Sequence, residues 1–132
     1  MSNYATENLR TLALVGHGSC GKTTLIEAML YRAGMIPEMG SIQRGTTMCD
    51  NDLLEKEVGH SIRLAVAHID TAMTDLTPVR IHILDTPGYP DYLGQDMSAL
   101  DAVKSVCAVI DPTKGPELLT RRLMAMAKER GL

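Results

Sequence analysis

Residues 16–23 read Gly16-His17-Gly18-Ser19-Cys20-Gly21-Lys22-Thr23, after the apolar run Leu-Ala-Leu-Val at 12–15 and before a helical pattern. The spacing fits G-x-x-x-x-G-K-[ST], and a strand before it and a helix after it are the context that a phosphate loop requires. Glycines let successive backbone N–H groups surround phosphates, and the helix adds its positive N-terminal end. The motif therefore predicts a nucleoside triphosphate site in a P-loop domain; a glycine turn before an ordinary helix is the alternative.

Two side chains of this phosphate loop have defined chemical roles. Lys22 would supply positive charge to the β- and γ-phosphates, and the Thr23 hydroxyl can ligate Mg²⁺, which keeps water and phosphate oxygens as its other ligands. We expect the whole loop, with Thr24 after it, to bind the nucleotide. Cys20 lies at a helix N-terminus, which can activate a thiol, but a tolerated small side chain is the simpler interpretation. His17 is interpreted as a loop residue without a proton-transfer role.

A second phosphate-facing motif, Asp85-Thr86-Pro87-Gly88, follows the alternating apolar run at 79–84. Its carboxylate emerges at the C-terminal end of a strand, where open α/β sheets place their ligands. Asp85 suits the magnesium shell, directly or through water, and the Gly88 N–H suits the γ-phosphate. Alone, this tetrapeptide would be a turn in most proteins. Together with the phosphate loop, it predicts a second wall of one nucleotide site.

The remaining periodicity predicts a three-layer α/β sandwich, with a mostly parallel sheet and one antiparallel strand pair. The first helix should begin near Lys22 and stop at Gly34, and its apolar face should consist of Leu25, Ile26, Met29 and Leu30. The other expected elements are an antiparallel pair at 62–67 and 79–83, a buried strand at 106–110, and helices at 92–103 and 116–129.

Residues 34–60 show little periodicity, so they predict a long and partly mobile loop. We expect the segment 36–60 to be poorly ordered without nucleotide, because its few apolar residues bury little surface. The acidic run from Asp50 to Glu57 is interpreted as a solvated face, with a regulatory contact as the alternative.

Composition narrows the class of protein and its setting. A chain of 132 residues with 45% hydrophobic content fits one domain. The net charge of −3 gives no general attraction to DNA, RNA or anionic membrane, so neither DNA nor a membrane is expected as a partner. Three cysteines without a signal-like start indicate free thiols in a reducing compartment, and no apolar run approaches the roughly 20 residues that cross a bilayer. We expect a cytoplasmic protein.

Together these residues resemble the translational GTPases, and elongation factor G in particular, over nearly the whole chain. Beyond the two motifs, the resemblance is carried by Asn8-Leu9-Arg10, Gly45-Thr46-Thr47, Gly59-His60-Ser61-Ile62, Tyr89-Pro90-Asp91-Tyr92 and the ending Ala127-Lys128-Glu129-Arg130-Gly131-Leu132. It implies GTP and GDP as ligands, Mg²⁺ as the cofactor, GTP hydrolysis as the activity and the ribosome as the partner. It also implies a first switch at about 36–61 and a second switch at about 85–96.

The resemblance assigns two further residues and shows one departure. Ser61 takes the place of the first-switch threonine that meets magnesium, although a plain strand-edge hydroxyl is the alternative. Tyr89 stands where the family usually carries a histidine that orients the attacking water. A phenol cannot repeat the proton chemistry of an imidazole, though it can hydrogen-bond a water. We therefore expect a paralogue of the main translocase, with Lys22, Gly88 and Tyr89 as the catalytic candidates.

Asn-Lys-x-Asp, the guanine-reading motif of the family, does not occur in these 132 residues. We therefore expect the N-terminal part of a longer GTP-binding domain, truncated before its last strands, with guanine specificity carried by resemblance alone. Such a fragment should be weak or inactive as an enzyme, and strand 106–110 should leave a bare edge prone to self-association. Other functions left open are a nucleotide-sensing module with negligible hydrolysis, a release factor, a ribosomal protection protein, and, less favoured, a P-loop ATPase or kinase.

Overall fold

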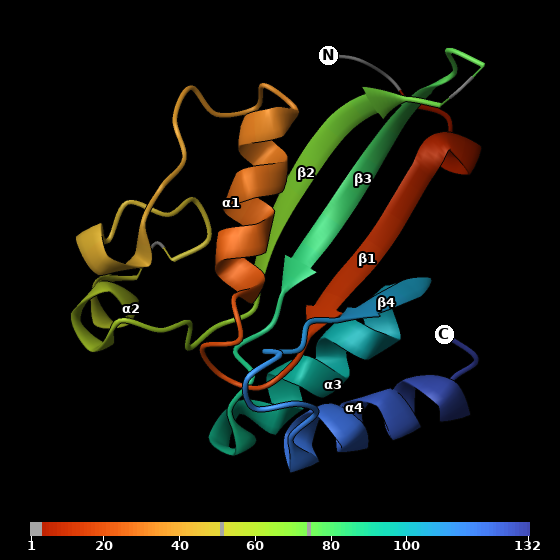
Figure 1. Ribbon diagram of the computed structural model, residues 1–132. Coiled ribbons are helices and arrows are strands. Elements are labelled where there is room, and N and C mark those ends of the chain that lie inside the picture. The colour runs from red at the N-terminus through yellow and green to blue at the C-terminus, as the bar shows by residue number, and fades with distance from the viewer. Residues whose placement is uncertain (1–3, 51, 74) are drawn as a thin grey trace.

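The computed structural model describes residues 4–50, 52–73 and 75–132, and over these residues it shows a four-stranded sheet between two layers of helices (Figure 1). The strands are β1 (Leu9–Val15), β2 (Ala65–Ala72), β3 (Pro78–Asp85) and β4 (Ser105–Ala108), in the order β2-β3-β1-β4. β1 is parallel to β3 and to β4, whereas β2 is antiparallel to β3. The predicted α/β class, with a mostly parallel sheet and one antiparallel pair, is confirmed.

Helices cover both faces of this sheet (Figure 1). α1 (Lys22–Arg32) lies on one face, whereas α3 (Leu93–Ala102) and α4 (Leu118–Glu129) lie on the other. The short helix α2 (Leu53–Val58) belongs to a segment that projects beside α1, away from α3 and α4. Single turns of 3-10 helix occur at Thr6–Asn8, Ile42–Arg44 and Pro90–Tyr92.

Strand β1 divides the core into two halves, because successive side chains of a strand point to opposite faces of its sheet. Ala13 and Val15 pack with residues of α3 and α4, and Leu14 packs with residues of α1. All three side chains are at most 1% exposed. Full burial of a side chain such as Leu14 stabilises the fold by roughly 1.5–3 kcal/mol. The end of β1, and the phosphate loop that follows it, is thus held from both sides.

The apolar face of α1 agrees with the predicted one at all but one position. Ile26 and Leu30 are buried and Met29 packs partly against the same cluster. Leu25 is 39% exposed, so its place on the buried face was wrongly predicted. Adjacent residues of a helix lie about 100° apart around the axis, and the side chain of Leu25 therefore turns away from the sheet that Ile26 contacts.

The alternating pattern predicted a strand that begins at Ile62. In the structure β2 begins three residues later, at Ala65. The buried Glu55 carboxylate accepts hydrogen bonds from the backbone N–H groups of Ile62 and Arg63, both at 2.9 Å. These two donors are therefore not available to a strand ladder, and pairing starts only after them. The predicted antiparallel partnership with β3 is confirmed, but the first three residues of the expected strand belong to the preceding loop.

The segment 34–60 is also more structured than predicted. α2 begins with a capping box, in which the Asp52 side chain accepts from the Leu54 N–H and Glu55 accepts from the Asp52 N–H. The acidic run was wrongly interpreted as a solvated face at two positions, since Asp50 is 3% and Glu55 is 4% exposed. Asn51, in the same run, lies outside the described residues.

The three cysteines are free thiols in three different settings. Cys49 is buried in the cluster beneath α1, Cys20 is half-buried in the phosphate loop, and Cys107 is exposed on β4. Burial raises the pKa of Cys49 well above its ordinary range, and the nearby carboxylates raise it further. Among the helices of the described residues, none is both long and apolar enough to span a bilayer.

Candidate functional site

The phosphate loop joins β1 to α1 at the C-terminal edge of the sheet. Ser19 and Gly21 adopt left-handed backbone conformations, with φ of 62° and 100°, within the turn between strand and helix. Leu14 of β1 lies opposite Asp85 of β3, so the parallel register brings the two predicted motifs to one edge of the sheet. The Thr86 hydroxyl donates to the Leu14 carbonyl at 2.9 Å and fastens the second motif to the first strand.

Lys22 is the buried cation of this site, with 5% of its surface exposed. Its ammonium donates to the backbone carbonyls of Gly16 at 3.1 Å and His17 at 2.9 Å. A Cβ at Gly88, whose φ is 78°, would lie 2.3 Å from the Gly16 carbonyl oxygen and 2.4 Å from Lys22 Nζ. Because only glycine fits there, the backbone of the second motif and the ammonium of the phosphate loop approach the same point.

A chain of hydroxyl and carboxylate groups links the two motifs to the segment before β2. The Thr23 hydroxyl donates to Asp85 Oδ2 at 2.6 Å, and the hydroxyl oxygens of Thr23 and Ser61 are 3.2 Å apart. The Ser61 hydroxyl donates to Asp50 Oδ1 at 2.6 Å, and the Thr47 hydroxyl donates to Asp50 Oδ2 at 2.9 Å. The three residues predicted to ligate a metal, Thr23, Ser61 and Asp85, are therefore joined through Thr23.

The Asp85 carboxylate is the most deeply buried acid of this chain of contacts, at 1% exposed. Burial raises its pKa to about 6, while the hydrogen bond from Thr23 and the charge of Lys22 lower it. Its second oxygen, Oδ1, has no hydrogen-bond partner among the described residues. A buried carboxylate oxygen without a partner, on a carboxylate that accepts the Thr23 hydroxyl, is a suitable environment for a hard cation.

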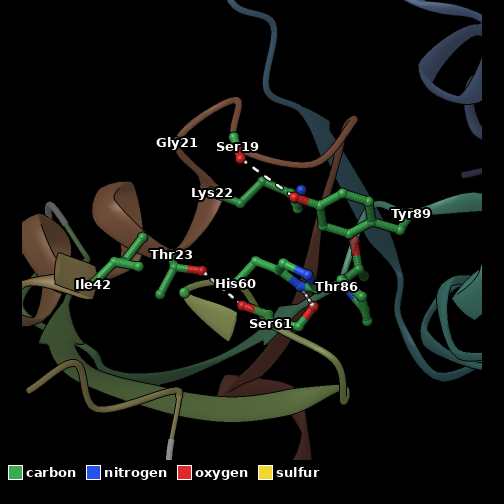
Figure 2. A pocket seen from close by; sticks show the side chains of 11 residues that line it. Ser19, Gly21, Lys22, Thr23, Ile42, His60, Ser61, Thr86 and Tyr89 are labelled. Atoms are coloured by element: carbon green, nitrogen blue, oxygen red, sulfur yellow. Dashed lines mark hydrogen bonds between the residues drawn. The ribbon is translucent and has the colours of Figure 1, made fainter. Parts of the chain in front are cut away.

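Tyr89 covers the phosphate loop (Figure 2). A Cβ at Gly18 would come within 2.1 Å of the Tyr89 ring, and the Tyr89 hydroxyl oxygen lies 3.3 Å from Ser19 Oγ. The His60 ring lies next to it, with ring centroids 4.5 Å apart. The cavity that these side chains leave has a volume of about 40 Å³, enough for a few water molecules. Its lining residues are Ser19, Gly21, Lys22, Thr23, Ile42, Gly59, His60, Ser61, Thr86, Pro87 and Tyr89.

Over residues 7–132 the sequence matches the family described as "Elongation factor Tu GTP binding domain". The chain belongs to this family. Its members are translational GTPases, which bind guanine nucleotides, as the resemblance implied. The predicted phosphate loop and second motif both lie within the matched region.

Relatives of known sequence or structure extend well beyond this GTPase domain. The chain is 34% identical over 121 residues to the tetracycline resistance protein TetM from transposon Tn1545 of Enterococcus faecalis, covering 92% of this chain and 18% of that protein. It is 35% identical over 127 residues to peptide chain release factor 3 of Streptococcus uberis, covering 93% and 24%. A crystal structure of a Thermus thermophilus protein superposes with a TM-score of 0.84 at 35% identity, covering 93% of this chain and 18% of that one. The chain therefore spans less than a quarter of the length of each of these relatives.

Four residues predicted to bind the nucleotide, His17, Cys20, Thr24 and Asp85, have side chains that do not line the central cavity, and two of them, His17 and Thr24, point elsewhere. The buried His17 ring lies toward α4, with Nε2 3.3 Å from Glu117 Oε1, so only the backbone of His17 faces Lys22. Thr24 is exposed and lines a separate shallow pocket with residues 39–43. For both residues, the part available to a ligand at the central cavity is the main chain.

Three buried acids of the GTPase domain, Glu27, Asp50 and Glu55, were missed in the sequence analysis. Asp50 and Glu55 lie in an acidic run that looks solvated, although the spacing from Asp52 to Glu55 is that of a capping box. Glu27, 1% exposed on α1, accepts the backbone N–H groups of Gly40 and Met48 and so fastens the segment between α1 and α2 to α1. The contacts of Glu27 and Asp50 have no such local signal in the sequence.

Asp96 of α3 lies behind the second motif and is fully buried. Neither of its carboxylate oxygens has a well-formed hydrogen bond within the described part of the chain. Burial raises the pKa of Asp96, and the Thr86 hydroxyl and the Gly88 N–H, which face the carboxylate, lower it. A buried carboxylate that lacks a well-formed hydrogen bond therefore lies behind the turn that carries Gly88.

Proposed function

We propose that this chain is the GTP-binding and GTP-hydrolysing switch domain of an elongation factor G-like translation factor that acts on the ribosome. The observation that carries the proposal is the convergence of Lys22, Thr23, Ser61 and Asp85 at the C-terminal ends of β1 and β3. Positive charge, hydroxyl oxygen and carboxylate oxygen are the groups that hold a magnesium-bound triphosphate. The two segments proposed as switches, 36–61 and 85–96, both contribute residues to this point.

The residues present fit Mg²⁺ as the cation. Asp85 Oδ1 lacks a partner among the described residues, the Thr23 hydroxyl bonds the other oxygen of the same carboxylate, and the Ser61 hydroxyl oxygen lies 3.2 Å from that of Thr23. No group of three or more His, Cys, Asp or Glu residues in the described part of the chain has metal-binding geometry. Water and phosphate oxygens must therefore complete the shell, which suits Mg²⁺. When bound, the ion would neutralise charge on the β- and γ-phosphates.

Hydrolysis by this site would rest on positioning and electrostatics. The Lys22 ammonium and the Gly88 N–H are the donors for the γ-phosphate, where negative charge accumulates in the transition state. In the structure, Lys22 bonds two carbonyls of the phosphate loop and Tyr89 packs on Gly18. Nucleotide binding therefore requires the Lys22 ammonium to exchange these carbonyls for phosphate oxygens.

The ribosome is proposed as the partner through the relatives. Peptide chain release factor 3 is by its name a factor of translation, and elongation factor Tu gives its name to the family. A cytoplasmic setting, where ribosomes translate, agrees with three free thiols.

The test is GTP turnover by the protein as the cell makes it, with and without ribosomes, in the presence and absence of Mg²⁺. We expect turnover that ribosomes stimulate and that chelation of Mg²⁺ abolishes. Competition between GTP and ATP for binding should favour GTP. Equal binding of ATP would instead support the less favoured interpretation as an ATPase or kinase.

A nucleotide-sensing module with negligible hydrolysis is the second candidate, and Tyr89 is the observation that favours it. If position 89 orients the attacking water as in the family, Tyr89→His should raise ribosome-stimulated turnover. Absence of any turnover in the wild type and in this variant, with GTP binding intact, would favour the sensing module.

A further inference from the structure

His60 places an imidazole inside the nucleotide cavity, although no motif marks it as functional. It follows Gly59, whose left-handed backbone (φ 72°) ends α2 and turns the chain toward the phosphate loop. The ring lies between Ser61 and Tyr89 and faces the loop that carries Lys22 (Figure 2). An imidazole is therefore present at the site, contributed by the first-switch segment and not by position 89.

Of the four histidines in the chain, His60 alone lines this cavity. His17 turns to Glu117 at the start of α4, and His68 and His82 face one another across the β2–β3 pair. In this structure the central cavity therefore has a single imidazole in its lining, that of His60.

The contacts of Tyr89 give it a positioning role. Its ring packs on Gly18 and its hydroxyl oxygen lies 3.3 Å from Ser19, so the phenol is engaged with the phosphate loop. Its ring also contacts the His60 ring at a centroid distance of 4.5 Å, with the planes tilted by 39°. Tyr89 therefore sets where the His60 ring stands, and it does so from the position at which the family usually carries a histidine.

A hydrogen bond fixes which nitrogen of His60 is free. Nδ1 lies 3.3 Å from the Ser61 carbonyl oxygen. A carbonyl oxygen can only accept, so Nδ1 carries the hydrogen in this contact. In the neutral ring, Nε2 then has an unshared electron pair and can accept a hydrogen bond from a water in the cavity. The volume of about 40 Å³ admits such a water.

We propose that His60 is the hydrogen-bond acceptor that orients the attacking water, an inference that rests on the GTP hydrolysis proposed above. In that step the water oxygen forms a bond to the γ-phosphorus while the bond from the γ-phosphorus to the bridging oxygen of GDP breaks. The water proton that does not point to His60 moves to a γ-phosphate oxygen, and the proton that points to His60 stays on the attacking oxygen. GDP and dihydrogen phosphate leave, and His60 ends the step unchanged.

Three substitutions of His60 separate this role from packing against Tyr89. His60→Ala removes both the ring and the acceptor, His60→Phe keeps a ring without the acceptor, and His60→Gln restores an acceptor oxygen. His68→Ala, on the exposed side of β2, is the matched control. Each variant of the protein as the cell makes it is assayed for ribosome-stimulated single-turnover GTP hydrolysis and, by calorimetry, for affinity to a non-hydrolysable GTP analogue.

We expect the Ala and Phe variants to lose at least about tenfold in hydrolysis rate, with analogue affinity changed by less than about twofold. The Gln variant should hydrolyse GTP faster than the Phe variant, and the His68 variant should match the wild type. A Phe or Ala variant that hydrolyses GTP at the wild-type rate overturns the inference. So does a parallel loss of turnover and analogue affinity in all three variants, since His60 would then be structural.

Failure of the proposed function is seen separately. A wild type without turnover contradicts GTP hydrolysis itself, whereas failure of the His60 inference leaves wild-type turnover intact. The ¹⁵N chemical shifts of the imidazole, measured without nucleotide, give an independent check. We expect the neutral ring to carry its hydrogen on Nδ1, and a neutral ring with its hydrogen on Nε2 overturns the inference.

Discussion

Lys22 is the single side-chain cation at the meeting point of the two motifs within the described residues, and its ammonium already bonds two carbonyls there. We predict that Lys22→Ala weakens GTP binding by more than about tenfold, because each hydrogen bond to a charged group contributes roughly 1.5–3 kcal/mol. Calorimetry with GTP measures the loss. Lys128→Ala, on the exposed side of α4, is the control. Unchanged affinity in the Lys22 variant would contradict the phosphate-loop assignment.

Asp96 offers a test of stability, since burial raises the pKa of its carboxyl above the ordinary value of 3.8. Between that value and the raised one, the folded protein binds more protons than the unfolded chain, so the free energy of unfolding falls as pH rises. Asp96→Asn removes the buried charge. We predict that it stabilises the fold at pH 7 by about 1–3 kcal/mol, with the gain shrinking as pH falls toward 4. Denaturant unfolding at several pH values measures this.

The control for Asp96 is Asp91→Asn, an exposed acid of the same motif region. It should change stability little at any pH. A gain at pH 7 that persists unchanged at pH 4 would show that removal of the Asp96 charge is not what stabilises the fold, and a loss of stability at pH 7 would show that its neighbours stabilise the carboxylate.

At the scale of elements, the segment between α1 and β2 is held by three buried carboxylates. Glu27 accepts the N–H groups of Gly40 and Met48, and Glu55 accepts those of Ile62 and Arg63. Asp50 accepts the hydroxyls of Thr47 and Ser61. Polar contacts fasten this segment where apolar burial is small, so order there depends on a few named acceptors.

This changes the prediction that the segment 36–60 is poorly ordered without nucleotide. We now expect slow hydrogen exchange at the amides of Gly40, Ile62 and Arg63 and fast exchange in the exposed stretches between them. Glu55→Ala should release Ile62 and Arg63, whereas Glu57→Ala, exposed on the same helix, should not. Uniformly fast exchange in the wild type would mean that the carboxylates do not hold the segment.

At the scale of the whole molecule, β4 and β2 form the two edges of the described sheet. β2 presents polar side chains at its edge, while β4 consists of Ser105, Val106, Cys107 and Ala108 without a charge. An uncharged edge invites pairing with another chain. We predict that a polypeptide of these 132 residues self-associates through β4, as measured by light scattering over a concentration series under reducing conditions.

Cys107→Lys is the variant that tests this pairing, because Cys107 is an exposed residue of β4. Val109, just after β4, is less suitable because it packs partly against the core. A charge at this position should restore the monomer. A monomeric wild-type polypeptide at high concentration would show that the edge is protected by structure that the sheet order does not reveal.

The sequence predicted what is local. The phosphate loop follows its strand directly and precedes its helix, so its place could be read from spacing, and the motif at 85–88 follows its own strand in the same way. The contact of Thr23 with Ser61 spans 38 positions, and only likeness to a family indicated it. The late start of β2 could not be predicted, because Glu55 takes the donors of Ile62 and Arg63 from outside the strand pattern.

The three free thiols differ in exposure, so their rates of chemical labelling report on three different parts of the molecule. An alkylating reagent should modify Cys107 first, since it is exposed, and Cys49 last, since burial both hides it and raises its pKa. Cys20 stands between them, half-buried beside Lys22, whose Nζ lies 3.9 Å from its sulfur. Its rate of alkylation should fall when a nucleotide occupies the loop. Mass spectrometry of the three cysteine-containing peptides from one reaction would therefore report the exposure of the sheet edge at Cys107, ligand occupancy at Cys20 and opening of the core at Cys49.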